Sequence, residues 1–348
     1  MRFYTAQHQF YCGIDLHARS LYTCILNQDG ETVVHRNLPA EPDALLSLLA
    51  PYREDVAVAA ECTFTWYWLA DLCAREKIPF VLGHALYMKA IHGGKTKNDR
   101  IDSRKIAGLL RGGMFPLAYV YPAEMRGTRD LMRRRTYLVR RRADLLAHIQ
   151  NTNSQWNLPA FGRKIAYRVH RQGVAEQFTD PAVQKSIEVD LELIDHYDLL
   201  IGDLERYILK LAKQHDPQDL MLLRTVHGIG KVLALTILYE IHDIQRFPRV
   251  QDFVSYARLV KCVKESAGKR HTGSSGQKIG NVHLKWAFSE AAVLFLRANP
   301  RGLKYKQRLE NKHGKAKALS IIAHRLGRAV YFMLLRKKAF DMNKFLNT

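Results

Sequence analysis

The sequence predicts an α/β domain with a mixed β-sheet, followed by a helical arm and a mainly helical C-terminal domain. Short apolar runs alternate with helical patterns in the first part of the chain. Apolar residues then recur at helical spacing up to residue 215, and helical patterns return after residue 220. A chain of 348 residues is long enough for two compact domains with an arm between them. The predicted boundaries are 8–121, 122–218 and 219–348.

The N-terminal domain begins with three predicted strands, joined by tight turns such as Asn27–Gly30. Helices and buried strands then alternate. This order predicts a mixed sheet with helices packed against it. The expected strands are 10–15, 21–26, 32–34, 55–60 and 79–82, and the expected helices are 65–77, 99–111 and one that begins at Pro42.

The arm is predicted to be an antiparallel hairpin of two long helices. Leu131, Leu138, Leu145 and Ile149 form an apolar stripe at helical spacing, which breaks at Pro159. The second helix carries apolar residues three, four and seven apart, which is the spacing of a coiled-coil seam. Two ordinary bundle helices are the alternative. The seam residues are Ile187, Leu191, Ile194, Ile201, Leu204, Ile208 and Leu211.

The C-terminal domain contains a short glycine segment between two helical patterns. Val226–Gly230 resembles the turn of a helix-hairpin-helix, in which glycines allow backbone N–H groups to approach a DNA phosphate. Gly228 and Gly230 are therefore predicted to contact nucleic acid. A plain turn between two helices has the same composition, so this alternative stays open.

The chain is strongly basic, with a formal net charge of +21 and an isoelectric point of about 9.8. This excess favours a polyanionic partner, and nucleic acid is the commonest one. A membrane surface is the alternative, but we expect no apolar run long enough to span a bilayer. The five cysteines form no CxxC pair, which argues against a zinc site or a disulfide framework. We therefore expect a cytoplasmic protein that binds nucleic acid and no membrane.

Four carboxylates stand where a metal site can form. Asp15 and Glu61 end predicted strands, and ligands gather at strand ends in α/β sheets. Asp99 and Asp102 are three residues apart, so they share one face at the start of a helix. Acids brought together repel one another unless cations neutralise them, and carboxylates suit Mg²⁺ or Mn²⁺. Two such ions are the usual device for phosphodiester cleavage.

Each of these acids, taken singly, has an ordinary structural explanation, such as helix capping by Asp99. The order of all four on this topology, in a basic chain, favours the metal site instead. Lys97, Arg100 and Arg104 stand beside the acid pair and would attract the phosphates of a nucleic acid.

Residues 261–281 are rich in Gly, Ser and Lys and form the least globular part of the C-terminal domain. Composition alone predicts a flexible loop that contacts DNA through its basic residues. The segment also holds three serines, and a serine hydroxyl can act as a nucleophile once it is activated. The serines are Ser266, Ser274 and Ser275, and the basic residues are Lys269, Arg270 and Lys278.

Three short motifs stand in order along the chain: Tyr11–Asp15, Ala60–Thr63 and Lys97–Ser103. They resemble the DEDD motifs of the bridge-RNA-guided insertion-sequence transposases. The stretch from Val226 to Asn281 resembles the second, transposase domain of that family. The resemblance covers nearly the whole chain, including the helical arm.

The resemblance implies a RuvC-like N-terminal domain with the RNase H fold, in a transposase that cuts and rejoins donor and target DNA. It implies two Mg²⁺ or Mn²⁺ ions held by Asp15, Glu61, Asp99 and Asp102. It also implies a structured guide RNA that pairs with both DNAs. A dimer or tetramer is expected, because the family builds composite sites from the acids of one subunit and the serine of another.

In the family, the nucleophilic serine follows a glutamate, which corresponds here to Ser266 after Glu265. Glycine often follows that serine, whereas Ala267 stands here, so Ser274 and Ser275 remain alternatives. We expect the RNA to bind arginines of the arm, because guanidinium groups pair with phosphates and stack on bases. These arginines are Arg133, Arg134, Arg135, Arg140, Arg141 and Arg142.

Three functions are consistent with these features. The first is an RNA-guided DNA recombinase that uses a serine nucleophile. The second is a metal-dependent junction-resolving endonuclease that uses water, which would not require the C-terminal domain. The third is a nucleic-acid-binding protein whose acids are only structural, and it predicts that replacing Asp15 or Glu61 leaves function intact. We rank the recombinase first, since it gives every part of the chain a role.

Overall fold

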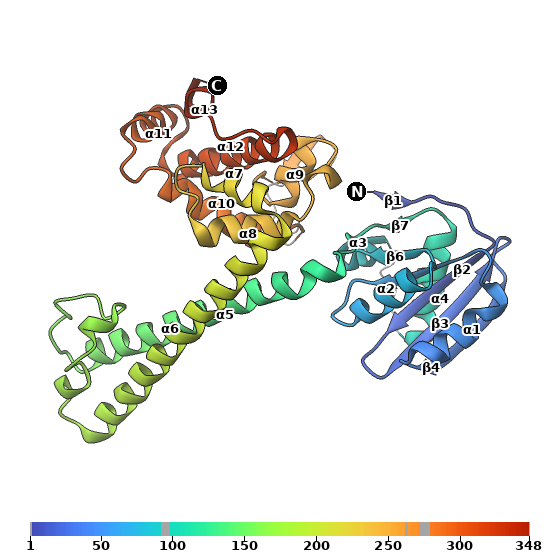
Figure 1. Cartoon of the computed structure of the whole chain (residues 1–348), viewed down its shortest axis with the longest axis horizontal. Helices are drawn as coiled ribbons and strands as arrows, with labels where there is room; N and C mark the ends of the chain where they lie inside the picture. The colour runs from blue at the N-terminus through green and yellow to red at the C-terminus, as the bar shows by residue number, and fades with distance from the viewer. Residues whose placement is uncertain (1, 92–97, 262–263, 267, 272–278, 348) are drawn as a thin grey trace. The chain divides into compact units, whose positions relative to one another are not determined.

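The computed structural model describes residues 2–91, 98–261, 264–266, 268–271 and 279–347. The chain divides into two compact units, Met1–Ala123 and Glu124–Thr348 (Figure 1). The first is a mixed α/β unit and the second is mainly helical, which confirms the coarse fold prediction. The predicted arm and C-terminal domain fall in one unit, because the arm helices share a core with the C-terminal helices.

The first unit is built on a five-stranded mixed sheet. Its strands are β2 (Phe10–Leu16), β3 (Ser20–Asn27), β4 (Thr32–Pro39), β5 (Val56–Glu61) and β6 (Phe80–Gly83). They lie in the order β4-β3-β2-β5-β6. The first three are antiparallel neighbours joined by short turns, whereas β5 and β6 run parallel to β2. Parallel neighbours require crossover connections, and helices supply them here.

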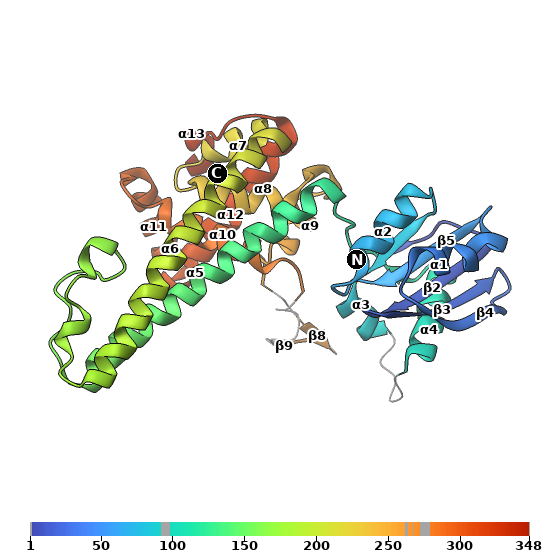
Figure 2. The ribbon, with the colours of Figure 1, turned by 60° about the horizontal axis from the view of Figure 1, so that its bottom comes forward.

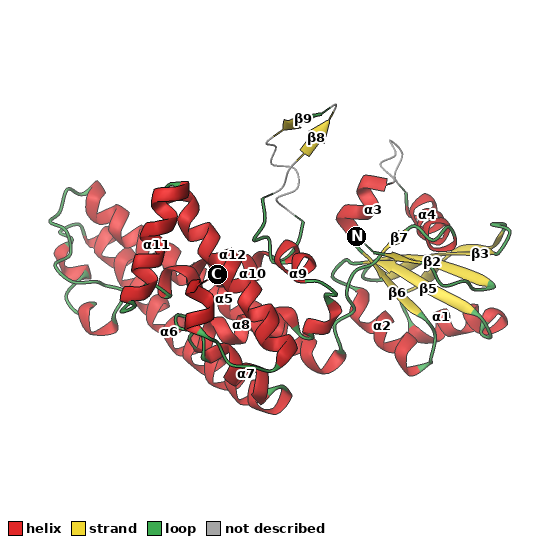
Figure 3. Cartoon of the chain, turned by 90° about the horizontal axis from the view of Figure 1, so that it is seen from above, coloured by secondary structure: helices red, strands yellow, loops and turns green. Residues whose placement is uncertain are grey.

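Helices cover both faces of this sheet (Figure 3). Alternate residues of each strand point to opposite faces. One face, which includes Ile14, packs against α1 (Pro42–Leu49) and α2 (Trp66–Arg75). The opposite face, which includes Tyr11, packs against α4 (Asp99–Arg111). The α4 bounds are those that the sequence predicts.

Helix α4 packs very close to β2, and Gly13 makes this approach possible. A Cβ atom on Gly13 would lie 2.3 Å from the backbone nitrogen of Ala107 and 2.4 Å from the carbonyl oxygen of Ser103. Any side chain at this position would push the helix away from the sheet. Since Gly13 precedes Asp15 on the same face of β2, the close packing brings the start of α4 near Asp15.

The sequence pattern does not predict three short elements of the first unit. β1 (Phe3–Tyr4) pairs with β7 (Phe115–Pro116) in a separate two-stranded sheet, and α3 (Ala85–Ile91) follows β6. Strands of two residues are too short to show a period of two, so only their pairing in the folded chain reveals them.

The second unit begins with two long helices, α5 (Ala123–Gln155) and α6 (Pro181–His215), which run side by side (Figures 1 and 2). Ion pairs join the two helices. In successive pairs the residue number increases along α5 and decreases along α6. The pairs are Arg135–Glu205 at 2.7 Å, Arg142–Asp198 at 2.6 Å and His148–Asp190 at 2.5 Å. The helices are therefore antiparallel, as predicted, while the coiled-coil geometry stays a prediction.

The remaining helices of the second unit surround a core rich in aromatic side chains, including Phe253, Phe288 and Phe295. The segment that composition predicts as a loop contains an antiparallel strand pair, β8 (Lys264–Ser266) and β9 (Lys269–His271). The helices are α7 (Pro217–Arg224), α8 (Lys231–Ile241), α9 (Val250–Tyr256), α10 (Val282–Leu294), α11 (Pro300–His313), α12 (Lys315–Arg336) and α13 (Met342–Asn347).

One described segment, Lys317–Arg336 of α12, is long and apolar enough to cross a membrane. The expectation that no run has this length and composition is therefore wrong. Half of the segment is buried, and Ile322, Leu326 and Val330 belong to the core of the second unit. A core helix satisfies the same criterion, so α12 is only a weak indication of a membrane span.

Candidate active site

Strand register places Asp15 and Glu61 beside each other. β2 and β5 are parallel, and their last registered pair is Ile14 with Ala60. The next residues along the two strands are Asp15 and Glu61, which lie at neighbouring strand ends. Because side chains alternate, both acids share the sheet face of Gly13, against which α4 packs.

The first turn of α4 supplies the other two acids. Asn98 caps this helix, and its side chain accepts a hydrogen bond from the backbone nitrogen of Ile101 at 2.8 Å. Asp99 and Asp102 follow in the first turn, where unpaired N–H groups favour negative charge. Asp102 also lies 3.5 Å from the ammonium group of Lys105. The cap therefore fixes where the helix starts and which face its acids occupy.

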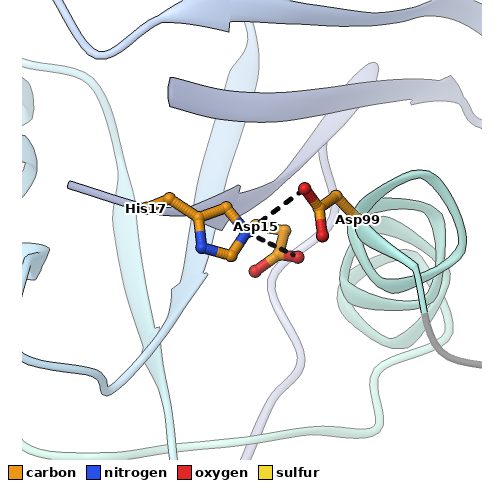
Figure 4. A group of neighbouring side chains, drawn as sticks. All are labelled: Asp15, His17 and Asp99. Carbon is orange, nitrogen blue, oxygen red and sulfur yellow. Dashed lines mark ion pairs between the residues drawn. The ribbon is translucent and has the colours of Figure 1, made fainter. Parts of the chain in front are cut away.

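His17 joins this group, although it is not among the residues predicted from the sequence. Its Nε2 atom lies 3.5 Å from a carboxylate oxygen of Asp15 and 3.4 Å from one of Asp99 (Figure 4). His17 follows β2, and its backbone nitrogen donates to the carbonyl oxygen of Ser20 in the turn to β3. The spacing Asp15-Leu16-His17 could have indicated it, since residues two apart in extended chain point to the same side.

The described residues therefore contain a group with the ligand chemistry of a divalent metal site. One ligand atom each from Asp15, His17 and Asp99 can be chosen so that all lie within 4.8 Å of one another. A single ion with bonds of about 2.1–2.4 Å could bridge atoms at such separations. The two carboxylates suit Mg²⁺ or Mn²⁺, whereas the imidazole favours the transition metal Mn²⁺ over Mg²⁺. Glu61 and Asp102 lie on the adjoining strand end and helical turn.

The predicted nucleophile lies in the second unit. Ser266 ends β8 and pairs in register with Lys269 of β9, next to Arg270. The competing serines and two of the predicted basic contacts lie outside the described residues. These are Ser274, Ser275, Lys97 and Lys278.

Two family models match separate parts of the chain. Residues 12–155 match the DEDD transposase model of the IS110 group, and residues 220–307 match the model described as "Transposase IS116/IS110/IS902 family". The chain belongs to this transposase family. The first match spans all four acids of the candidate site, and the second includes Ser266.

Two curated proteins are similar to this transposase. It is 21% identical to the transposase for insertion sequence element IS1111A of Coxiella burnetii (strain RSA 493 / Nine Mile phase I), over 94% of this chain and 90% of the relative. It is 25% identical to y4qE of Sinorhizobium fredii (strain NBRC 101917 / NGR234), which also carries a transposase name, over 54% of this chain and 44% of the relative.

The transposase has two further cations beside its acids. Arg100 and Arg104 project from the exposed side of α4, within the turns that carry Asp99 and Asp102. Their exposure leaves the guanidinium groups accessible to a phosphate, and binding of nucleic acid by them stays a prediction.

The two glycines of the turn between α7 and α8 differ in their surroundings. Gly228 has a φ angle of +91°, and a Cβ atom there would lie 2.5 Å from the backbone nitrogen of Phe295. It is thus required for packing against the end of α10. Gly230 is exposed, and a Cβ atom there would meet nothing within 4 Å. Of the two, Gly230 has the backbone that a phosphate could approach.

The arginines of the arm also fall into two groups. Arg133, Arg135 and Arg142 bind carboxylates of the second unit, which are Glu240, Glu205 and Asp198 respectively. The other three predicted contacts are exposed on α5, and the Arg134 and Arg141 guanidinium groups flank the ring of Tyr137 at 5.4 Å and 5.1 Å. The exposed group consists of Arg134, Arg140 and Arg141. Arg141 also pairs with the exposed Asp144 on the same helix, at 3.1 Å. Binding of RNA by the exposed group stays a prediction.

We expect His17→Ala to weaken Mn²⁺ binding by about tenfold, because it removes one of the three clustered ligand atoms. Electron paramagnetic resonance titration would give the affinity, and spin-echo spectra would show nitrogen coupling to Mn²⁺ only with His17 present. His196→Ala, at an exposed position on α6, is the control. Unchanged affinity with no nitrogen coupling in the wild type would show that His17 is not a ligand.

Proposed function

We propose that this insertion-sequence transposase cuts and rejoins donor and target DNA with Ser266 as its nucleophile. The observation that carries the proposal is the meeting of Asp15, His17 and Asp99, within the part of the chain that matches the DEDD transposase model. The serine of the second match supplies a nucleophile that a hydrolytic nuclease would not need.

The first unit would have a RuvC-like RNase H fold and hold the metal ions. Asp15, Glu61, Asp99 and Asp102 would bind two Mg²⁺ or Mn²⁺ ions, with His17 as a further ligand. Bound ions neutralise phosphate charge and stabilise the oxygen that leaves. Arg100 and Arg104 would hold the adjoining DNA backbone against the acidic group.

The hydroxyl of Ser266 would attack the phosphorus atom of the scissile phosphate. A bond forms between Oγ and phosphorus as a phosphorus–oxygen bond of the DNA backbone breaks. The hydroxyl proton passes to solvent, and the released DNA hydroxyl takes up a proton. Rejoining is the reverse reaction, in which a DNA hydroxyl attacks the phosphoserine ester and frees Ser266. No external energy source is needed, since one phosphoester bond replaces another.

Three parts of the chain would share this work. They are the nuclease domain (8–121), the arm (122–218) and the transposase domain (219–348). A structured guide RNA would bind the exposed arginines of α5, and base pairing would supply sequence specificity. Gly230, Lys269, Arg270 and Lys278 would contact DNA. The active enzyme would be a homo-oligomer, a dimer or tetramer, with composite sites. It would act in the cytoplasm of a prokaryotic cell, on the nucleoid.

The test is formation of a covalent protein–DNA adduct by the purified full chain. The mixture contains Mg²⁺, labelled donor and target DNA, and RNA transcribed from the flanks of the gene. We expect the adduct to require RNA, and to be lost in both Ser266→Ala and Asp15→Ala, because each removes a different half of the chemistry. Adduct formation is read on a denaturing gel.

Three other outcomes would contradict the proposal. Cleavage that survives Ser266→Ala without an adduct would indicate water as the nucleophile, as in a junction-resolving endonuclease. An adduct that survives Ser266→Ala would move the role to Ser274 or Ser275. Full activity of Asp15→Ala would remove the acidic group from the reaction.

A further inference from the structure

The segment that carries Ser266 is closed at its base by contacts between its two ends. Before the segment, Tyr256 accepts a hydrogen bond through its carbonyl oxygen from the backbone nitrogen of Asn281, at 2.6 Å. Arg258 donates through Nε to the carbonyl oxygen of Gly280, at 2.9 Å. Gly280 has a φ angle of +95°, and a Cβ atom there would lie 2.5 Å from the Tyr256 oxygen. We call residues 256–258 and 280–281 the loop base.

Asn281 has two roles at the loop base. Its Oδ1 atom accepts hydrogen bonds from the backbone nitrogens of His283 and Leu284, at 2.9 Å and 3.0 Å, and so caps α10. Its Nδ2 atom donates to a carboxylate oxygen of Glu240 at 2.7 Å. Asn281 is 6% exposed and Glu240 is 2% exposed, so water competes little with this bond.

Glu240 connects the loop base to the arm. Its carboxylate, on α8, accepts hydrogen bonds from Nε and Nη2 of Arg133, at 2.7 Å and 3.0 Å, and from Nε of Arg129, at 3.2 Å. Both arginines belong to α5. One buried carboxylate therefore holds three partners, two from the arm helix and one from the base of the serine-bearing segment.

A buried ionic group of this kind adds little net stability compared with apolar packing, because it must be desolvated. Its geometry is highly specific, however, since each partner has to meet a particular lone pair. The strand pair β8–β9 consists of two three-residue strands, and a short isolated hairpin is marginal by itself. The orientation of such a hairpin depends on how firmly the loop base is held in place.

We infer that Glu240 and Asn281 are positioning residues, which fix the loop base to α5 and thereby set where Ser266 is presented. The inference rests on the proposed role of Ser266. A nucleophile must be held close to its line of attack, and a displacement of about 1 Å can cost about a hundredfold in rate. Loss of the link would therefore lower the rate of attack and leave the DNA-binding surfaces intact.

The sharpest test is Asn281→Ser, with Asn299→Ser as its matched control. Serine can still cap a helix, but it cannot reach Glu240. Asn299 caps α11 in the same way, accepting from the backbone nitrogen of Gly302 at 3.0 Å, and it is similarly buried, at 7% exposed. The two substitutions therefore remove the same atoms from equivalent positions, and only one breaks the link to α5.

With saturating DNA and RNA, we expect Asn281→Ser to slow Ser266-dependent adduct formation by about tenfold or more, with DNA affinity changed by less than about twofold. Asn299→Ser should retain the wild-type adduct rate. Hydrogen exchange should rise at residues 279–284 in Asn281→Ser alone. Equal adduct rates in the two variants, or a parallel loss of affinity and rate, would overturn the inference.

Glu240→Gln separates this inference from the proposed function. It should raise hydrogen exchange at both 279–284 and 126–133, because the amide cannot serve all three partners. Hydrogen exchange does not depend on whether the protein cleaves DNA. An adduct that still forms in Ser266→Ala would contradict the proposed function. Unchanged hydrogen exchange at 279–284 in Glu240→Gln would contradict the link between the loop base and α5.

Discussion

Gly13→Ala should destabilise the first unit by about 3 kcal/mol and displace α4 from the sheet. The new Cβ atom would lie 2.3 Å and 2.4 Å from backbone atoms of Ala107 and Ser103, which cannot rotate away as a side chain could. Since the same helix carries Asp99, its displacement should also separate Asp99 from Asp15. We therefore expect weaker Mn²⁺ binding together with lower stability, measured by urea unfolding and by Mn²⁺ titration.

Gly108→Ala is the matched control for this prediction, because it makes the same substitution within α4, the helix that Gly13 of β2 contacts. A Cβ atom on Gly108 would meet nothing within 4 Å. Alanine is also the better helix former, so this variant should gain about 0.5–1 kcal/mol. A Gly13→Ala protein as stable as the wild type, with unchanged Mn²⁺ affinity, would show that α4 can move without disturbing the site.

The second large effect concerns Glu240 and acid. Burial alone raises the pKa of this carboxyl, but the hydrogen bond from Arg133 and the charges of Arg129 and Arg133 outweigh it and lower the pKa from 4.5 to about 2. A carboxyl whose pKa is lowered by folding stabilises the fold at pH values above its pKa in the unfolded state. This contribution is lost as the pH falls through its pKa in the folded state. Glu240 should therefore contribute about 3 kcal/mol at neutral pH that is lost between about pH 5 and pH 2.

The measurement is urea unfolding of wild type and Glu240→Gln over this pH range. The difference between the two proteins should be largest near neutral pH and shrink toward pH 2. Glu205→Gln is the control, since Glu205 binds Arg135 and Lys231 but is more exposed, and its loss should matter less. A difference that does not vary with pH would mean that the arginines stabilise the fold without stabilising the charge of Glu240.

Much of the fold of the first unit could be predicted from local patterns. The three opening strands, the strands that contain residues 56–60 and 80–82, and the helix that starts at Asp99 all appear in the structure. The short pair β1–β7 and helix α3 could not be predicted, because they lack a repeating pattern. The strand pair β8–β9, whose first strand ends with Ser266, lies in a segment that composition predicts as loop, since Gly and Lys are depleted in strands.

The candidate site shows the same division. Asp15, Glu61, Asp99 and Asp102 could be chosen from the sequence because strand ends and a helix start are visible in it. His17 was missed, because its position between two carboxylates depends on the turn into β3 and on the packing of α4. Register and close packing join residues that are far apart in the chain, and no local period encodes them.

By itself, the sequence determines the strong positive charge and the motifs of the family, and it predicts the order of the domains and the four acids of the candidate site. The tertiary structure decided which cations are already bound by carboxylates, as for Arg133 with Glu240. It also decided that Gly13 and Gly228 are needed for backbone packing. The physical reason is that strand and helix periods extend over a few residues, whereas burial and ion pairing depend on which surfaces meet after folding.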